Sequence, residues 1–188
     1  MAKARATLDR RVRRTRQALV GAFNGLLFER GYAELSVDEL AERAHVGRST
    51  FYEHYRGKDA ILGDSLKGAL GVVADSVGTR DNTPELARLL DHFWDKRSFA
   101  RAVLTGRTGA RIRKVLIDLI AERLALEFGR STVLWLIPRR LVAIQLGESL
   151  LATLTAWLVG EAPCRAQDLA MALRRVARSA LEALATRK

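Results

Sequence analysis

Apolar residues recur at intervals of three and four along most of the chain, the spacing that places them on one face of a helix. The first such stripe runs through 7–29 and ends at Gly31, a residue type that caps helices. The segment 141–159 is apolar nearly all round, and an alternative start at Leu134 would put Pro138 in its first turn. No strand-like alternation stands out. The pattern predicts an all-α fold of about nine helices, at 7–29, 36–44, 47–55, 58–78, 83–96, 98–104, 110–128, 141–159 and 165–185.

Two of these helices are short and lie close together in the sequence. Ser36 and Glu39 fit a capping box, in which the serine hydroxyl accepts from the glutamate amide and the glutamate side chain reaches back. The residues Ala44-His45-Val46 predict a tight turn, and a second short helix runs from about Gly47 to Tyr55. Two short helices joined in this way against a longer one form a helix-turn-helix, whose second helix enters the DNA major groove.

The second short helix has a polar face with suitable chemistry for DNA. On a helical wheel Arg48, Ser49, Tyr52 and Glu53 share one face, and Phe51 suits the core. Arginine reads guanine through O6 and N7, and hydroxyl groups bond a phosphate or a base. The free N–H groups of a helix that starts near Gly47 favour a phosphate. The alternative is an ordinary surface helix with an aromatic pair in its core.

The segment Arg16–Leu62 closely resembles the N-terminal domain of the tetracycline-repressor-like (TetR) family. The matching motifs are AF at 22–23, RGY at 30–32, SVDELA at 36–41, the turn at 44–46, STFY at 49–52, HY at 54–55 and the start KDAIL at 58–62. The resemblance implies a homodimeric transcriptional regulator, usually a repressor, that a small-molecule ligand releases from a pseudo-palindromic operator. It implies a DNA-binding domain at 1–62 and a helical ligand-binding and dimerisation domain at 63–188.

The resemblance also implies roles for individual residues. It makes Arg48, Ser49 and Thr50 base-reading positions, and it adds contacts to phosphates. The phosphate-contacting positions are Ser36, Tyr52, His54 and Lys58. One departure is His45, which stands where the family commonly has glycine; a positive φ there is strained for histidine but tolerated.

The overall charge favours a polyanionic partner. The formal net charge is +11 at pH 7 and the pI is near 10.7. Arginines cluster before residue 17, and this arm either binds DNA phosphates or the minor groove, or is a solvated, frayed terminus. The chain has one cysteine, Cys164, and no secretory signal, which favours a reduced, cytoplasmic compartment. The apolar segment 141–160 carries Glu148 near its middle, so we expect burial in a helical bundle and no membrane span.

The second half resembles the family mainly in architecture. Two late helices are expected to pair with those of a second subunit, and Gly147 and Ala152 would allow close approach. Candidate interface residues are Leu150, Leu154, Trp157, Leu169, Leu173, Val176 and Leu181, although packing within one subunit is the alternative. Candidate residues for a ligand pocket are His92, Phe93, Trp94, Phe99, Leu116, Ile120, Trp135 and Glu148, each of which could instead be core.

The sequence offers no catalytic or cofactor motif. Three histidines and one cysteine have no metal-ligand spacing, and neither a phosphate-binding glycine loop nor a nucleophile elbow occurs. We therefore expect a non-enzymatic protein without cofactor or metal, whose partners are double-stranded operator DNA, an effector and a second copy. Two rival functions stay open. One is a helical dimer whose first domain binds a protein or an anionic surface, and the other is a nonspecific basic coat on nucleic acid.

Overall fold

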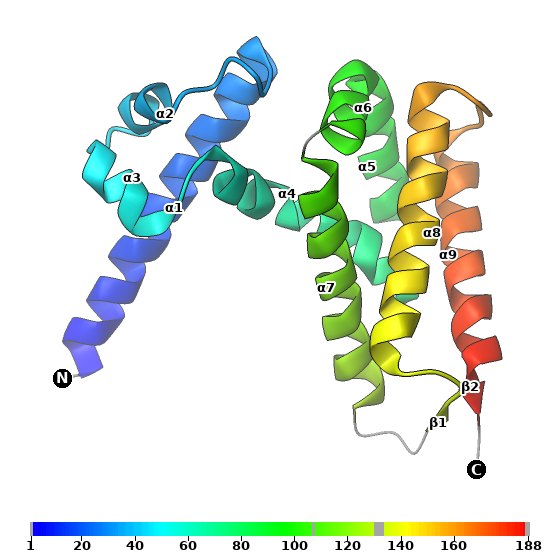
Figure 1. Cartoon of the computed structure of the whole chain (residues 1–188). Helices are drawn as coiled ribbons and strands as arrows, with labels where there is room; N and C mark the ends of the chain where they lie inside the picture. The colour runs from blue at the N-terminus through cyan, green and yellow to red at the C-terminus, as the bar shows by residue number, and fades with distance from the viewer. Residues whose placement is uncertain (1, 107, 130–133, 187–188) are drawn as a thin grey trace. The chain divides into compact units, whose positions relative to one another are not determined.

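The computed structural model describes residues 2–106, 108–129 and 134–186. It divides into two compact units, an N-terminal unit at Met1–Leu66 and a C-terminal unit at Lys67–Lys188. Within the described residues the chain forms nine α-helices, one short 3-10 helix and two strands of two residues each. The predicted all-α class is confirmed. Figure 1 shows the elements in order along the chain.

The N-terminal unit consists of a long helix and the two short helices that pack beside it. Helix α1 spans Ala2–Arg30, α2 spans Val37–Arg43, α3 spans Arg48–His54, and α4 begins at Lys58 and ends at Ala74. Helix α1 packs on α2, α2 packs on α3, and all three helices and the start of α4 contribute apolar side chains to the core of the unit. The fully buried side chains of this core are Leu19, Phe23, Leu40, Phe51, Ile61 and Leu62.

The C-terminal unit is a bundle of long helices. After η1 at Asp75–Val77 come α5 at Thr83–Asp95, α6 at Arg97–Thr105, α7 at Gly109–Phe128, α8 at Arg139–Val159 and α9 at Ala166–Leu184. The two most extensive packing contacts join α7 to α8 and α5 to α9. In Figure 1 the long helices α7, α8 and α9 lie side by side.

The helix bounds differ from the sequence pattern at several places, and the helix predicted at 58–78 is α4 followed by η1. Helix α1 begins at Ala2, before the predicted start at residue 7, because the segment 2–6 is rich in alanine, the strongest helix former, and continues the helix without an apolar stripe. Helix α8 does not extend back to Leu134. Instead Leu134–Trp135 forms β1, which pairs antiparallel with β2 at Ala185–Thr186. Pro138 is the N-cap of α8. The chain break predicted at 129–132 lies mostly outside the described residues.

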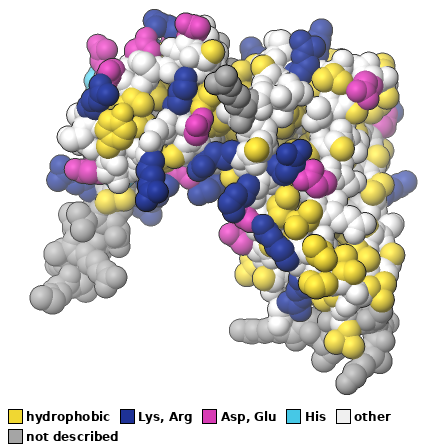
Figure 2. Space-filling view, viewed as in Figure 1, with side chains coloured by type: hydrophobic (Ala, Val, Ile, Leu, Met, Phe, Trp, Pro, Cys, Tyr) yellow, Lys and Arg dark blue, Asp and Glu magenta, His cyan; other side chains and the backbone are white. Residues whose placement is uncertain are grey.

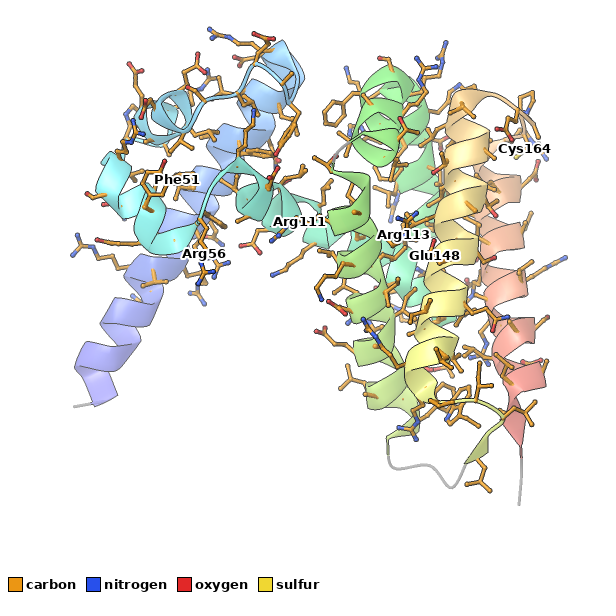
Figure 3. All side chains as sticks on the ribbon, viewed as in Figure 1. Phe51, Arg56, Arg111, Arg113, Glu148 and Cys164 are labelled. Atoms are coloured by element: carbon orange, nitrogen blue, oxygen red, sulfur yellow. The ribbon has the colours of Figure 1, made fainter. Side chains whose placement is uncertain are left out.

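Helix α8 is the one described helix that is long and apolar enough by length and composition to cross a membrane. An 18-residue stretch of this helix has a mean hydropathy of 1.5, and 50% of that stretch is buried inside the protein. Glu148 near its middle pairs with Arg113 of α7, with Nε and Oε1 2.7 Å apart; Figure 3 shows the two side chains next to each other. These features are those of a core helix in a bundle.

Candidate nucleic-acid interface

The turn between α2 and α3 is closed by two backbone hydrogen bonds. The amide of Val46 donates to the carbonyl of Ala41 at 2.9 Å, and the amide of His45 donates to Glu42 at 3.0 Å. This pair of bonds defines a Schellman motif, which satisfies the last carbonyls of α2. The motif needs a left-handed residue at its turn, and His45 supplies it with a φ of 53°. The start of α3 is thereby fixed relative to α2.

The start of α2 is fixed by the predicted capping box, which is confirmed. The Glu39 amide donates to Ser36 Oγ at 3.2 Å, and the Ser36 amide donates to Glu39 Oε2 at 3.2 Å. Hydrogen bonding to Ser36 lowers the pKa of Glu39, because both bonds favour its charged form. The Ser36 hydroxyl also donates to the same carboxylate, at 2.9 Å. Its hydrogen is therefore used within the cap, and the hydroxyl would reach a phosphate only by rotating away from Glu39.

Helix α3 separates its residues into a buried and an exposed side. Phe51 is fully buried and contacts the rings of Tyr52 and Tyr55, with centroids 5.5 and 5.9 Å away. The four residues predicted to share the polar face are all exposed, namely Arg48, Ser49, Tyr52 and Glu53. Thr50 and His54 are half-buried at its edges, and Gly47 is the exposed N-cap of the helix. A row of polar side chains thus points away from the core of the unit.

Arg48 is the most constrained side chain of that row. Its Nη1 donates to both carboxylate oxygens of Asp38, at 2.6 and 2.8 Å. Its guanidinium also lies over the ring of Tyr52, 5.8 Å from the centroid. The hydrogen bond to Tyr52 and the charge of Asp38 raise the pKa of Arg48. The sequence pattern contained Asp38 in SVDELA, but its pairing with Arg48 depends on how α2 and α3 cross.

Lys58, which is predicted to contact a phosphate, has its ammonium group bound to the protein backbone in this structure. Its Nζ donates to the backbone carbonyls of Tyr32, Ala33 and Leu35, at 3.2, 3.1 and 3.1 Å. The ammonium lies 4.8 Å from the centroid of the Tyr32 ring. An ammonium group has three donors, and these three carbonyls match that number. Lys58 therefore holds the connection between α1 and α2 to the start of α4.

A cluster of three polar side chains joins α1, the end of α3 and α4. The Tyr55 hydroxyl donates to Asp64 at 2.9 Å and accepts from Nε of Arg16 at 3.4 Å, and Arg16 also forms an ion pair with Asp64. Burial raises the pKa of Tyr55, and hydrogen bonding to Tyr55 raises that of Arg16. We did not expect this cluster from the sequence, where its members are far apart and none carries a recognisable motif.

Exposed arginines gather in the first half of α1. Among the side chains described there, five arginines are exposed, namely Arg10, Arg11, Arg13, Arg14 and Arg16. Figure 2 shows Lys and Arg side chains spread over both units on the face drawn. The side chains of residues 1–9, which contain the start of the predicted basic arm, lie outside the described residues.

The residues predicted for a ligand pocket are distributed over several elements of the C-terminal unit. Leu116 and Ile120 of α7 are fully buried in the core, whereas His92 of α5 is exposed. Glu148 is paired with Arg113 at the surface between α7 and α8. The aromatic members are half-buried: Phe93, Trp94, Phe99 and Trp135. The ring of Trp94 packs on that of Trp157, with centroids 4.8 Å apart, and the ring of Trp135 packs on that of Phe128, with centroids 5.3 Å apart.

The residues predicted for a subunit interface lie mainly inside the unit. Six of them are buried, namely Leu150, Leu154, Trp157, Leu169, Leu173 and Leu181. Only Val176 is exposed, at 59%. The faces of α8 and α9 that remain exposed carry Leu141 and Ile144, and Met171 and Val176. Between these faces runs a shallow apolar groove lined by Leu146, Ser149, Leu150, Thr153, Ala172, Leu173, Val176 and Ala177.

Metal-ligating side chains do not gather at any one place in the described parts of the chain. Among the side chains that the structure describes, no cluster of three or more His, Cys, Asp or Glu residues comes together. Cys164 is exposed in the loop between α8 and α9, as Figure 3 shows.

Comparison with known proteins matches this chain to regulators. Residues 22–64 match the family model described as bacterial regulatory proteins, tetR family. The HTH-type transcriptional regulator YdeS of Bacillus subtilis is 30% identical over 130 residues, which are 69% of this chain and 61% of YdeS. The transposon Tn10 TetC protein of Escherichia coli is 28% identical over 85 residues, 43% of each chain. The chain thus spans less than two thirds of the length of these relatives.

Solved structures share the fold across nearly the whole chain. A TetR transcriptional regulator from Streptococcus agalactiae covers 92% of this chain and 98% of its own, with a TM-score of 0.54 and 24% identity. FadR of Thermus thermophilus, a TetR family transcriptional repressor, covers 92% and 96%, with a TM-score of 0.56 and 20% identity. The family model spans the helix-turn-helix, and the regulators match the fold beyond it. The N-terminal unit therefore carries the helix-turn-helix domain of the tetR family of bacterial regulatory proteins, and the whole chain shares its fold with solved regulators of that family.

Proposed function

We propose that this protein is a homodimeric, DNA-binding transcriptional regulator, which represses its target until a small molecule releases it from a pseudo-palindromic operator. The N-terminal unit would read DNA with α3 in the major groove, and the C-terminal unit would bind the effector and a second subunit. The observation that carries the proposal is the exposed polar row of α3, which the Schellman turn and the buried Phe51 hold in a fixed direction. A regulator of this kind would act in the cytoplasm, where the DNA is.

Within this proposal the residues have distinct roles. Arg48, Ser49 and Thr50 read base edges, and Tyr52 and His54 bond phosphates beside them. Gly47 allows the backbone to approach the DNA closely. Ser36 and Lys58 act mainly by holding α2 and the loop before it in place, because their polar atoms are engaged in the cap and in three backbone carbonyls.

Binding to DNA that flanks the protein's own gene, compared with random duplex over a range of salt concentrations, tests the proposal. We expect strong preference for one site and a large loss of that preference in Tyr52→Ala. Arg48→Ala should lose the preference for the site as well. Arg88→Ala removes an exposed arginine of α5 and is the control for the change of charge, so it should keep the preference. Equal binding of both duplexes with a steep salt dependence would support the nonspecific coat. The absence of DNA binding would support the rival that binds a protein or an anionic surface.

The exposed faces of α8 and α9 are the proposed subunit contact. Between them lies the groove lined mainly by apolar side chains of α8 and α9, which suits the approach of a second helix pair. Val176→Glu would put a charge at the centre of this contact without disturbing the core, since Val176 is mostly exposed. We expect a dimer of the wild-type chain by light scattering and a monomer of Val176→Glu. An unchanged mass would place the contact elsewhere.

The effector site is proposed within the C-terminal unit. FadR of Thermus thermophilus, which has this fold, is described in complex with lauroyl-CoA. The candidate contacts on this chain stay those predicted from its sequence, among which the aromatic side chains of α5 and α6 are half-buried. A thermal-shift screen of small molecules, followed by release of bound operator, tests the proposal. A compound that stabilises the protein and lowers operator affinity in proportion would identify the effector.

A further inference from the structure

The guanidinium of Arg48 at the start of α3 is held by Asp38 in the first turn of α2. Nη1 donates to both carboxylate oxygens, at 2.6 and 2.8 Å. The same guanidinium lies over the ring of Tyr52, one turn further along α3. A carboxylate from one helix and an aromatic ring from the next therefore restrict the direction in which Arg48 extends.

This ion pair is badly placed to stabilise the fold. The side chains of Arg48 and Asp38 are 62% and 66% exposed. Exposed ion pairs contribute little to folding, because water and salt screen the attraction. The carboxylate also cancels much of the arginine's attraction for distant phosphates. An arginine that served only to bind the DNA backbone would gain nothing from Asp38.

The geometry suits the reading of a base. Both bonds to Asp38 leave from Nη1, and the guanidinium carries further N–H donors on Nε and Nη2. Guanine presents two acceptors in the major groove, O6 and N7, which an arginine meets with two bonds at once. A long side chain must lose rotamer freedom to make both bonds, and a partner that already restricts it lowers that cost.

We propose that Asp38 is a specificity-determining positioning residue, which holds Arg48 in the orientation that reads guanine and so strengthens discrimination at one operator position. The inference rests on the proposed function, since it requires α3 to enter the major groove. Asp38 acts through Arg48 and needs no contact with a base.

The test uses the full-length protein and selection of bound sequences from random duplex DNA. The wild-type protein should select a sequence motif, and Arg48→Ala should weaken the preference for guanine at one position of that motif. Asp38→Ala should lower the preference for guanine at the same position by roughly three- to tenfold, the range expected for losing the restraint on one long side chain. Its affinity for random duplex should stay the same or rise, because a negative charge is removed. Asp38→Asn keeps an oxygen acceptor and should recover part of the discrimination.

Glu29→Ala is the matched control. Glu29 accepts from Nη2 of Arg43 at 2.6 Å, and both side chains are about half exposed, so the variant removes a similar ion pair from the same unit. Its selected motif should equal that of the wild-type protein. Thermal unfolding of each variant checks that the helix-turn-helix remains folded.

The outcomes separate the inference from the function on which it rests. A wild-type protein that selects no motif overturns the proposed function, and the inference with it. A motif that Arg48→Ala relaxes and Asp38→Ala leaves unchanged overturns the inference alone. An Asp38→Ala variant that binds every sequence more tightly by the same factor also overturns it, because Asp38 would then only weaken binding through its charge.

Discussion

Gly147 of α8 lies directly against Ile117 of α7. A Cβ atom added at Gly147 would be 2.7 Å from Cγ1 of Ile117 and 3.6 Å from Cδ1 of Ile120. The sequence suggested that Gly147 allows close approach of a second subunit, but the glycine is buried inside its own unit. Its role is to bring α7 and α8 together, and these two helices share the most extensive packing of the unit.

Gly147→Ala should therefore destabilise the protein. Overpacking costs about 1–3 kcal/mol, which exceeds the gain of about 1 kcal/mol from the better helix former. In an Ile117→Ala background the same change should stabilise, because the clashing Cγ1 is gone. Urea unfolding of the wild-type protein, the two single variants and the double variant measures whether the effect of Gly147→Ala on stability changes sign. Gly21→Ala on α1, where a Cβ meets nothing within 4 Å, is the control and should stabilise. The same sign in both backgrounds would contradict the packing argument.

Lys58 should matter for stability more than for charge. Lys58→Met is expected to lower the free energy of unfolding by about 1–2 kcal/mol, since it leaves three carbonyls without their charged donor. The slope of DNA affinity against salt should change little. If Lys58 instead binds a phosphate, the variant would keep wild-type stability and lose about 0.9 from the salt slope. Chemical denaturation and a salt titration together decide between the two roles.

His45 occupies a backbone conformation that suits glycine. Its φ of 53° lies in the left-handed region, which costs roughly 1–2 kcal/mol for most residues with a side chain. We expect His45→Gly to leave stability unchanged or raise it by up to about 1 kcal/mol, because relief of strain outweighs the added chain entropy. His45→Val should destabilise by about 1–2 kcal/mol. Glu42→Gly, at a helical position in α2, should destabilise and serves as the control for glycine itself.

Tyr55 should give the stability a dependence on alkaline pH. Burial raises its pKa above 10.0 in the folded protein, so the folded state keeps a proton that the unfolded state releases. The stabilisation is complete below pH 10.0 and is lost as the pH rises through the folded value. Tyr55→Phe should cost about 1 kcal/mol at pH 9. This difference from the wild-type protein should shrink at pH 11, and a constant difference would argue against a buried neutral hydroxyl.

The basic arm of α1 should strengthen DNA binding through phosphates. Removal of residues 1–10 is expected to weaken binding and to flatten its dependence on salt, by about 0.9 in slope for each phosphate that the arm neutralises. Arg175→Ala, an exposed arginine of α9, controls for a change in net charge. Binding measured between low and high salt checks the prediction. An unchanged slope would mean that the arm is a solvated terminus.

The sequence by itself determined the helices, the cap and the turn of the N-terminal unit. These features depend on residues three to five positions apart, such as Ser36 with Glu39, and local spacing is enough to predict them. The exposed row of α3 follows for the same reason, since the helical period separates Phe51 from Arg48 and Tyr52.

The tertiary structure decided which surfaces face which neighbours. Asp38 meets Arg48, Arg16 meets Tyr55 and Asp64, and Gly147 meets Ile117 only because separate helices cross at particular angles. The same limit explains why the apolar stripes of α8 and α9 suggested an interface: a stripe shows that a face is covered, and both a core and a partner cover it equally well. Burial of Leu150 and Leu173 within one chain, and exposure of Val176, depend on how the bundle packs.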